Sequence, residues 1–243
     1  MLNHQFILGD CLEELKHLPD GCADLVLADP PFGQDPKSKW DVIIPFEPLW
    51  RQLKRIVKAN GVVVMMGQQP FTSKLILSNE SWFRYEWIWD KYNPRGRHQA
   101  KRQPMRKHEN ILVFSKSHDH NYFPVVVPRK KSVKLRLASK SGAIAKELVY
   151  THRNPTSIIE NRWEANRGAD KYHPAQKPVS LMEYLVCSYT QEGDTVLDFC
   201  FGGGSTGVAC VTTNRAFIGI EKNKAFFEVG KARILTALES PTL

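Results

Sequence analysis

A carboxylate followed by a stiff turn stands at the end of an apolar run near the start of the chain. Asp29, Pro30, Pro31 and Phe32 directly follow the run Leu25–Ala28. Pro31 has no N–H and a fixed φ, so the Pro30 carbonyl is not held in a local turn and can point outward beside Asp29. Two acceptors of this kind can hold both hydrogens of a nucleobase NH2 and favour its pyramidal, nucleophilic form. Phe32 offers a flat face for an extruded base. A plain turn after a strand is the alternative interpretation.

A second group of residues, about 170 positions later, suits a nucleoside-type ligand. The spacing predicts a strand over Thr195–Asp198, a Gly-rich turn over Phe199–Gly204 and a helix from Ser205. Glycines let backbone approach a ligand, and a helix N-terminus offers unpaired N–H groups to an anion. Another predicted strand, Ala216–Ile220, ends at Glu221, about twenty residues after the glycines, where a carboxylate can accept both hydroxyls of a ribose.

Four segments in a fixed order carry a family resemblance. DPPF, HPAQKP, DFCFGGGSTG and FIGIE resemble the β-class of S-adenosylmethionine-dependent amino-methyltransferases that act on DNA. In that family the catalytic tetrapeptide comes first, a target-recognition region follows, and the cofactor glycines come last. The resemblance covers nearly the whole chain, and the STGVAC continuation and short length are most similar to small phage or prophage adenine methylases. Many relatives have Phe where Cys200 stands, which concerns packing near the methionine part of the cofactor.

The resemblance implies S-adenosylmethionine as the cofactor and transfer of its methyl group to adenine N6 in DNA by base flipping. Relatives with Asp at the first tetrapeptide position mostly modify adenine, whereas Ser there usually marks cytosine N4, which is the alternative. The implied catalytic residues are Asp29, Pro30, Pro31 and Phe32. The implied cofactor-binding residues are Asp10, Cys11, His173, Gln176, Lys177, Pro178, Asp198, Phe199, Cys200, Gly202, Gly204, Ser205, Thr206, Glu221 and Lys222.

Several of these residues have specific implied roles. Asp10 would contact the adenine amino group of the cofactor, or cap the following helix, or do both. Lys177 would neutralise the methionine carboxylate, unless its loop is an ordinary start of a helix. Asp198 would accept from the methionine ammonium, or cap the Gly-rich turn. Ser205 and Thr206 would donate to the carboxylate or cap their own helix.

The positive charge is concentrated in one segment. Residues 91–140 contain fourteen Lys and Arg against Glu109 and Asp119, a balance of +12, so the remaining residues sum to −3 in a chain of net charge +9. A basic block between two near-neutral segments indicates a polyanion-binding surface, although a solvated face is the alternative. We expect double-stranded DNA as the partner. The candidate contacts are Arg95, Arg97, Lys101, Arg102, Arg106 and Lys107.

Composition excludes several classes. The five cysteines are scattered and form no Cys-x-x-Cys, so the sequence predicts neither a disulfide framework nor a zinc site, and no metal is expected. The N-terminus lacks a charged-then-apolar leader, and the longest apolar run, Val62–Met66, is too short to span a membrane. We expect a cytoplasmic protein encoded by a bacterium or a phage. Homodimers are common among relatives, and the resemblance leaves a homodimer open.

The predicted fold class is α/β, a Rossmann-like doubly wound and mostly parallel sheet with permuted motif order. Residues 1–90 would form the catalytic half, 91–170 a basic target-recognition insertion, and 171–243 the cofactor-binding half. Residues 115–170 show no clear periodicity and are predicted as mostly loop with short elements. Trp82, Trp87 and Trp89 are predicted to be core residues rather than base-stacking ones. The predicted strands are 6–8, 25–28, 62–66, 87–89, 110–114, 195–198 and 216–220, and the predicted helices are 11–18, 48–59, 70–78, 180–189, 205–211 and 224–238.

Two alternatives from other classes remain open. A nicotinamide-dependent oxidoreductase would also use a Gly-rich turn and a distant acid, but it gives no reason for Asp-Pro-Pro-Phe or for the basic segment. A non-catalytic DNA-binding protein on the same scaffold would keep the basic segment, yet it would have no need of Asp29 and Lys177.

Overall fold

The computed structural model describes residues 2–35, 37–38, 40–138, 144–160 and 176–239. An eight-stranded sheet within these residues has the strand order β1-β10-β9-β2-β3-β5-β4-β8. The pairs β1/β10, β10/β9, β9/β2, β2/β3 and β4/β8 are parallel, and β5 runs antiparallel to both of its neighbours. The predicted doubly wound, mostly parallel sheet is therefore confirmed. Its strands are β1 (His4–Leu8), β2 (Ala23–Ala28), β3 (Val57–Gly67), β4 (Phe83–Arg95), β5 (Arg106–Phe114), β8 (Ile158–Glu160), β9 (Thr195–Asp198) and β10 (Ala216–Glu221).

Helices cover both faces of the sheet. The helices are α1 (Cys11–Glu14), α2 (Phe46–Ile56), α3 (Phe71–Ser78), α4 (Val179–Tyr189), α5 (Ser205–Thr212) and α6 (Lys224–Glu239), with short 3-10 turns η1 (Leu15–His17), η2 (Glu80–Trp82) and η3 (Arg97–Gln99). One apolar core lies between the sheet and α4, α5 and α6, and a second lies between the opposite face and α1, α2 and α3. Every residue of β2 is buried because it has a helical layer on each side.

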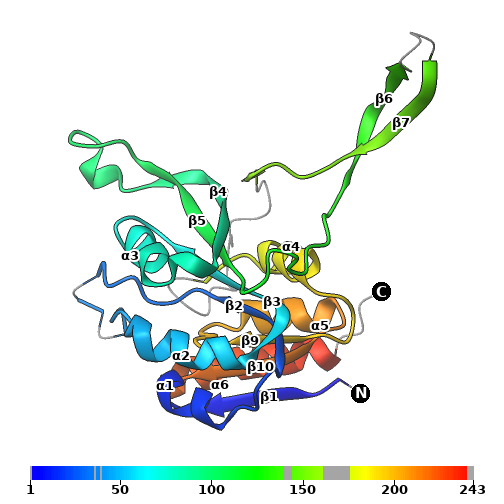
Figure 1. Ribbon diagram of the computed structural model, residues 1–243. Coiled ribbons are helices and arrows are strands. Elements are labelled where there is room, and N and C mark those ends of the chain that lie inside the picture. Colours follow the sequence, from blue (N-terminus) through cyan, green and yellow to red (C-terminus); the bar gives the residue numbers. More distant parts are fainter. Residues whose placement is uncertain (1, 36, 39, 139–143, 161–175, 240–243) are drawn as a thin grey trace.

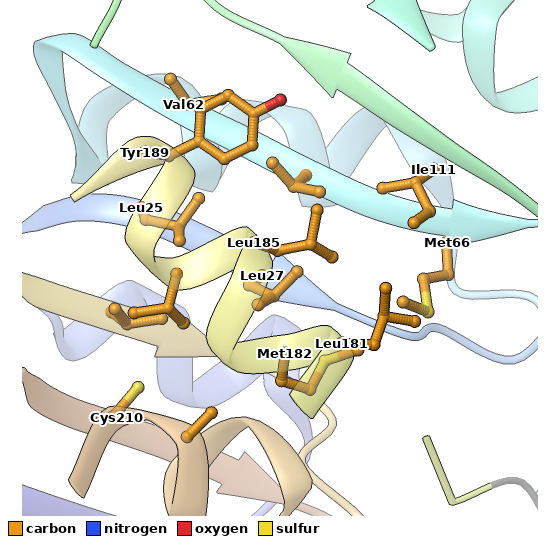
Figure 2. Packing of buried hydrophobic residues seen from close by; sticks show 14 of the residues in the cluster. Leu25, Leu27, Val62, Met66, Ile111, Leu181, Met182, Leu185, Tyr189 and Cys210 are labelled. Carbon is orange, nitrogen blue, oxygen red and sulfur yellow. The ribbon is translucent and has the colours of Figure 1, made fainter. Parts of the chain in front are cut away.

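Helix α4 shows how the first core is built. Leu181, Met182, Leu185 and Tyr189 of the helix pack over Leu25, Leu27, Val62, Met66 and Ile111 of the sheet (Figure 2). The hydroxyl of Tyr189 accepts a 2.7 Å hydrogen bond from Trp87 Nε1, so the buried phenol is satisfied. Trp87 and Trp89 are core residues, as predicted, whereas Trp82 is only partly buried.

Helix α2 ends three residues earlier than predicted. The chain becomes extended at Val57, which pairs with Ala23 of β2, so β3 begins there and contains an irregularity before Val62. The apolar side chain of Val57 is buried in this position, and burial in the sheet outweighs the helical propensity of the following Lys58 and Ala59.

A two-stranded hairpin forms part of the segment 115–170, which we predicted as mostly loop with short elements. Strands β6 (Val127–Ala138) and β7 (Ile144–Arg153) pair with each other in an antiparallel ribbon that is separate from the eight-stranded sheet. The ribbon extends away from the central sheet (Figure 1). The prediction of mostly loop is wrong here, because period-2 alternation in Val133-Lys134-Leu135 is a strand signal even within a basic segment. The central sheet also includes β5, so part of the segment 91–170 belongs to the scaffold.

The sheet brings the two groups of candidate residues together. Strands β2 and β9 are parallel neighbours, with Leu25 opposite Val196 and Val26 opposite Leu197. The helix after β9 lies in one core and the helix after β2 lies in the other. The chain therefore leaves these two strands in opposite directions, which creates the crevice where open α/β sheets bind ligands.

Candidate active site

One cavity of about 990 Å³ lies at this crevice and is lined from both halves of the chain. Its volume is in the range of pockets that hold a cofactor or drug-sized ligand. The sequence-predicted residues that line it are Asp10, Cys11, Asp29, Pro30, Pro31, Phe32, Arg95, Arg106, Gln176, Lys177, Asp198, Phe199, Cys200, Gly202, Ser205, Thr206, Glu221 and Lys222. Residues implied for the base and residues implied for the cofactor therefore face one space.

Other predicted residues do not line this cavity. Arg97, Lys101, Arg102 and Lys107 lie outside it, and so does Pro178. Gly204 also lies outside, and it has φ +76°; a Cβ there would be 2.7 Å from the Gly230 carbonyl oxygen, so this glycine allows α6 to pack against the turn. His173 falls outside the described residues.

The catalytic carboxylate predicted at Asp29 has two unlike oxygens. Oδ2 accepts a hydrogen bond from Lys177 Nζ, whereas Oδ1 is buried without a hydrogen-bond partner among the described residues. Burial raises the pKa of Asp29, against the opposing effect of the Lys177 ammonium. A buried acceptor with no partner is costly unless a ligand supplies the donor, so Oδ1 is suited to receive an N–H group.

Lys177 contacts two carboxylates. Besides Asp29, its Nζ lies 3.5 Å from Glu109 Oε2, and Glu109 Oε1 in turn accepts a 2.8 Å bond from Lys91. Burial alone would lower the pKa of Lys177, but the carboxylates of Asp29 and Glu109 raise it. Lys177 is therefore a buried ammonium group paired with two carboxylates of the protein. The predicted role of Lys177, to neutralise the methionine carboxylate, did not include these two contacts.

Glu109 and Lys91 are site residues that the sequence did not single out. Both lie on the β4/β5 pair, next to the parallel part of the sheet, and both line the cavity. Burial would raise the pKa of Glu109, but the ammonium groups of Lys177 and Lys91 outweigh it and lower the pKa. The available signal was an acid two positions before the apolar run Ile111–Phe114, in a segment where acids are rare.

The cofactor end of the cavity is acidic and well ordered by backbone amides. Asp198 is 3% exposed, and its Oδ1 accepts a 3.0 Å bond from the Cys200 amide. Burial raises the pKa of Asp198 to about 7. Glu221 accepts from the amides of Gly202 at 3.0 Å and Asn223 at 2.7 Å, which fixes its carboxylate at the end of β10.

Asp10 has two contacts in the structure. Its Oδ1 accepts a 2.9 Å bond from the Leu12 amide, so the predicted capping of the first helix is confirmed. Its Oδ2 accepts a 2.9 Å bond from Lys222, and this hydrogen bond lowers the pKa of Asp10.

Burial raises the pKa of the Cys200 thiol well above its usual range, so this cysteine is not a thiolate nucleophile.

The segment after the tetrapeptide is held by one carboxylate. Asp41 accepts from the backbone amides of Gly33 at 2.9 Å, Gln34 at 2.7 Å and Asp35 at 2.7 Å. Phe32 packs on Phe71 with ring centroids 5.1 Å apart. These contacts fix the wall of the cavity next to Asp29, and the sequence did not indicate this role for Asp41.

Fold and site together define a class. A doubly wound sheet carries a Gly-rich turn, two buried acids at adjacent strand ends and an Asp-Pro-Pro-Phe segment around one cavity. This arrangement suits an enzyme that transfers a group from a nucleoside cofactor to a second substrate in the same cavity. A family model described as DNA methylase matches residues 23–232, so the chain belongs to this family of DNA methyltransferases. Its cofactor is S-adenosylmethionine. The nicotinamide-dependent alternative is thereby excluded.

Individual relatives agree with this assignment. The type II methyltransferase M.HinfI of Haemophilus influenzae is 27% identical over 258 residues, which cover 96% of this chain and 68% of that protein. M.HpaI of Haemophilus parainfluenzae is 27% identical over 254 residues, with 96% and 74% covered. The M1.HpyAVI–SAM complex has a TM-score of 0.61 and 24% identity, covering 95% of this chain and 98% of that one. The PvuII DNA methyltransferase (cytosine-N4-specific) has a TM-score of 0.69 and 14% identity, with 98% and 93% covered.

Metal clusters and membrane helices are both absent from the described residues. Among them, no group of three or more His, Cys, Asp or Glu side chains is arranged to hold a metal ion. No helix in the same part of the chain is long and apolar enough to cross a membrane.

Proposed function

We propose that this enzyme transfers a methyl group to N6 of adenine in double-stranded DNA, with the target base flipped into the cavity beside Asp29. The observation that carries the proposal is the buried, unpartnered Oδ1 of Asp29 in the space shared with the cofactor residues. Adenine is preferred because the tetrapeptide begins with Asp, as it mostly does in adenine-modifying members of the β-class. Cytosine N4 is the second candidate, since a solved structure of similar fold is a cytosine-N4-specific enzyme.

The residues of the cavity fit S-adenosylmethionine. The buried Asp198 carboxylate, which accepts from the Cys200 amide, suits an ammonium group, and the fixed Glu221 carboxylate suits a pair of ribose hydroxyls. Asp10 lies in the same cavity wall and retains acceptor capacity for an amino group. When bound, the cofactor supplies an electrophilic methyl group.

The protein's part in the reaction is to position and polarise the amino group. Asp29 Oδ1 and the Pro30 carbonyl would accept its two hydrogens, which frees the nitrogen lone pair from the ring. Positive charge that develops on the nitrogen would be stabilised by the Asp29 carboxylate, whose side chain is only 23% exposed. The N–C bond would form as the bond between the methyl group and the cofactor sulfur breaks, with the electron pair of that bond left on sulfur. One N–H proton would then be lost, and Asp29 Oδ1 would take it up before its release to solvent. Catalysis then comes from positioning and electrostatics without a covalent enzyme intermediate.

Two basic hairpins would hold the duplex. The β4–β5 connection carries Arg97, Lys101 and Arg102, all exposed, and the β6–β7 ribbon carries further exposed cations at Arg129, Lys130, Lys131 and Lys134. The two hairpins extend beyond the helical layers in Figure 1. Lys and Arg on phosphates would fix the orientation of DNA without reading its sequence. Arg106 is less free, because it donates to the side chains of Gln34 and Gln68.

Product analysis tests the proposal. The enzyme would be incubated with duplex DNA and S-adenosylmethionine labelled in the methyl group, and the DNA would then be digested to nucleosides. We expect the label in N6-methyladenine from the wild type and no label from Asp29→Ala. Label in N4-methylcytosine would replace the adenine assignment by the cytosine one. Duplex binding without any label in DNA would favour the non-catalytic alternative.

A further inference from the structure

A chain of alternating charges leads from the β4/β5 pair to the catalytic carboxylate. Lys91 Nζ lies 2.8 Å from Glu109 Oε1, Glu109 Oε2 lies 3.5 Å from Lys177 Nζ, and Lys177 donates to Asp29 Oδ2. Lys91 comes from β4, Glu109 from β5, Lys177 from the segment before α4, and Asp29 from the end of β2. The β4/β5 strand pair, the end of β2 and the segment before α4 therefore meet through two ammonium groups and two carboxylates.

These side chains are largely removed from water. The exposed fractions are 12% for Lys91, 11% for Glu109 and 10% for Lys177, against 23% for Asp29. Buried ions are costly unless each has partners of opposite charge, and removal of one partner leaves an uncompensated charge. Lys177 lies between two carboxylates, so its ammonium group forms ion pairs with both Asp29 and Glu109.

We propose that Glu109 and Lys91 are positioning residues that control how Lys177 engages Asp29, so that Oδ2 is paired while Oδ1 stays available to the substrate amino group. Glu109 draws Lys177 toward β5 and prevents the ammonium from bridging both oxygens of Asp29. Lys91 forms an ion pair with the other oxygen of Glu109, Oε1. This pair prevents Glu109 from attracting Lys177 so strongly that Lys177 no longer contacts Asp29. This inference rests on the proposed role of Asp29.

Removing the acid Glu109 and removing the base Lys91 from this series of charges should have opposite effects on Asp29. In Glu109→Gln, Lys177 has one carboxylate left to pair with, so it would bridge Asp29 and block Oδ1. In Lys91→Met, Glu109 would compete fully for Lys177, so Asp29 would lose its counter-ion. The direction for Asp29 follows from charge: removal of Glu109 lowers its pKa, and removal of Lys91 raises it. The titratable groups that act on Asp29 or respond to it, from every element around it, are Lys177, Glu109, Lys91, Asp198 and Cys200.

The experiment measures the pH dependence of methyl transfer to duplex DNA at saturating cofactor for the wild type, Glu109→Gln and Lys91→Met. We expect both variants to be slower by about tenfold or more on the pH plateau, because the acceptor is misplaced. The acid limb of the pH–rate profile, where the rate falls as Asp29 is protonated, should move to lower pH in Glu109→Gln and to higher pH in Lys91→Met. Glu86→Gln is the matched control: it removes a carboxylate from the same strand pair, where Glu86 Oε2 accepts from Asn110 at 2.8 Å, and it should leave rate and limb unchanged.

A second measurement does not depend on catalysis. Carbon NMR of labelled aspartate carboxyl groups follows the titration of Asp29 in the protein alone, with its signal identified by its disappearance in Asp29→Asn. The same two opposite shifts should appear there. If one variant does not fold, the other variant and the NMR titration still test the positioning role of Glu109 and Lys91. Wild-type rate and an unmoved limb in either folded variant, or shifts of equal direction, would overturn the inference. An Asp29→Ala enzyme that still methylates DNA would instead overturn the proposed function.

Discussion

Cofactor binding should depend on pH through Asp198. This carboxyl is buried, and its pKa of about 7 is far above the ordinary value of 3.8. An ammonium group binds well only to the ionised carboxylate, so binding must first remove the proton. At pH 6 about one tenth of the molecules carry the carboxylate, which weakens binding about tenfold, or by about 1.4 kcal/mol. The dissociation constant should fall about tenfold per unit between about pH 5.5 and 7 and then level off.

Titration calorimetry with S-adenosylmethionine tests this expectation, with Asp198→Asn and adenosine as controls. The Asn variant keeps an acceptor for the Cys200 amide but cannot ionise, so its affinity should be lower by about 1.5–3 kcal/mol at pH 7.5 and nearly independent of pH. Adenosine lacks the methionine part, so its affinity should not change over the same range. A flat dissociation constant for the wild type below pH 7 would refute the reasoning. An unchanged slope in Asp198→Asn would assign the titration to another group.

The same carboxyl affects folding stability in the absence of cofactor. Its pKa is higher in the folded protein than in the unfolded chain, so its contribution is fully present below about pH 4 and disappears as pH rises through about 7. At pH 8 the free energy of unfolding of Asp198→Asn should therefore exceed that of the wild type by up to about 4 kcal/mol, which would be seen as a higher melting temperature. The difference should vanish near pH 4. Equal melting temperatures at pH 8 would contradict the assigned shift.

Three further predictions concern the base site, the cofactor site and the DNA surface. Asp29→Ala should abolish methyl transfer while S-adenosylmethionine affinity, measured by calorimetry, changes less than about tenfold; a larger decrease would place Asp29 in the cofactor site. Glu221→Ala should weaken cofactor binding by about 1.5–3 kcal/mol without changing DNA affinity, and an unaltered cofactor dissociation constant would remove its ribose role. Neutralising three cations on either hairpin should flatten the salt dependence of DNA binding by up to about 0.9 for each phosphate that is no longer neutralised, and an unchanged slope would exclude that hairpin. The two sets are Lys101, Arg102 and Lys107, and Arg129, Lys130 and Lys131.

The parts of the site that could be predicted from sequence are those at strand ends. Apolar runs locate β2, β9 and β10, and Asp29, Asp198 and Glu221 follow from where those runs stop. The partner of Asp29 could not be predicted in this way. Lys177 is 148 positions away in the segment before α4, and it reaches Asp29 because α4 packs over β2 and Ser205 Oγ donates to the Lys177 carbonyl. Glu109 was counted only as a charge, because nothing in its segment indicates that β5 runs antiparallel beside β3.

The β6–β7 ribbon was missed for a different reason. Its lysines and arginines alternate with apolar residues and so mark the period of two, but within a basic segment they were interpreted as a charge pattern and not as a strand signal. Asp41 was missed because its role is to accept from backbone amides of Gly33 to Asp35, a contact set by loop geometry that residue types alone do not specify.

The strand order has a consequence for synthesis on the ribosome. Within the described sheet the first strand, β1, pairs with β10 alone, and its register joins His4 to Phe217 and Leu8 to Glu221. The partner of β1 is therefore made more than 200 residues after it. At typical elongation rates this is a wait of roughly 10 to 40 s, during which the hydrogen-bonding edge of β1 has no partner strand. Strands β9 and β10 must then enter between β1 and β2, so the sheet closes only when the last quarter of the chain has left the ribosome. Until that point the edges of β1 and β2 that pair with β10 and β9 have no partner strand in the nascent chain.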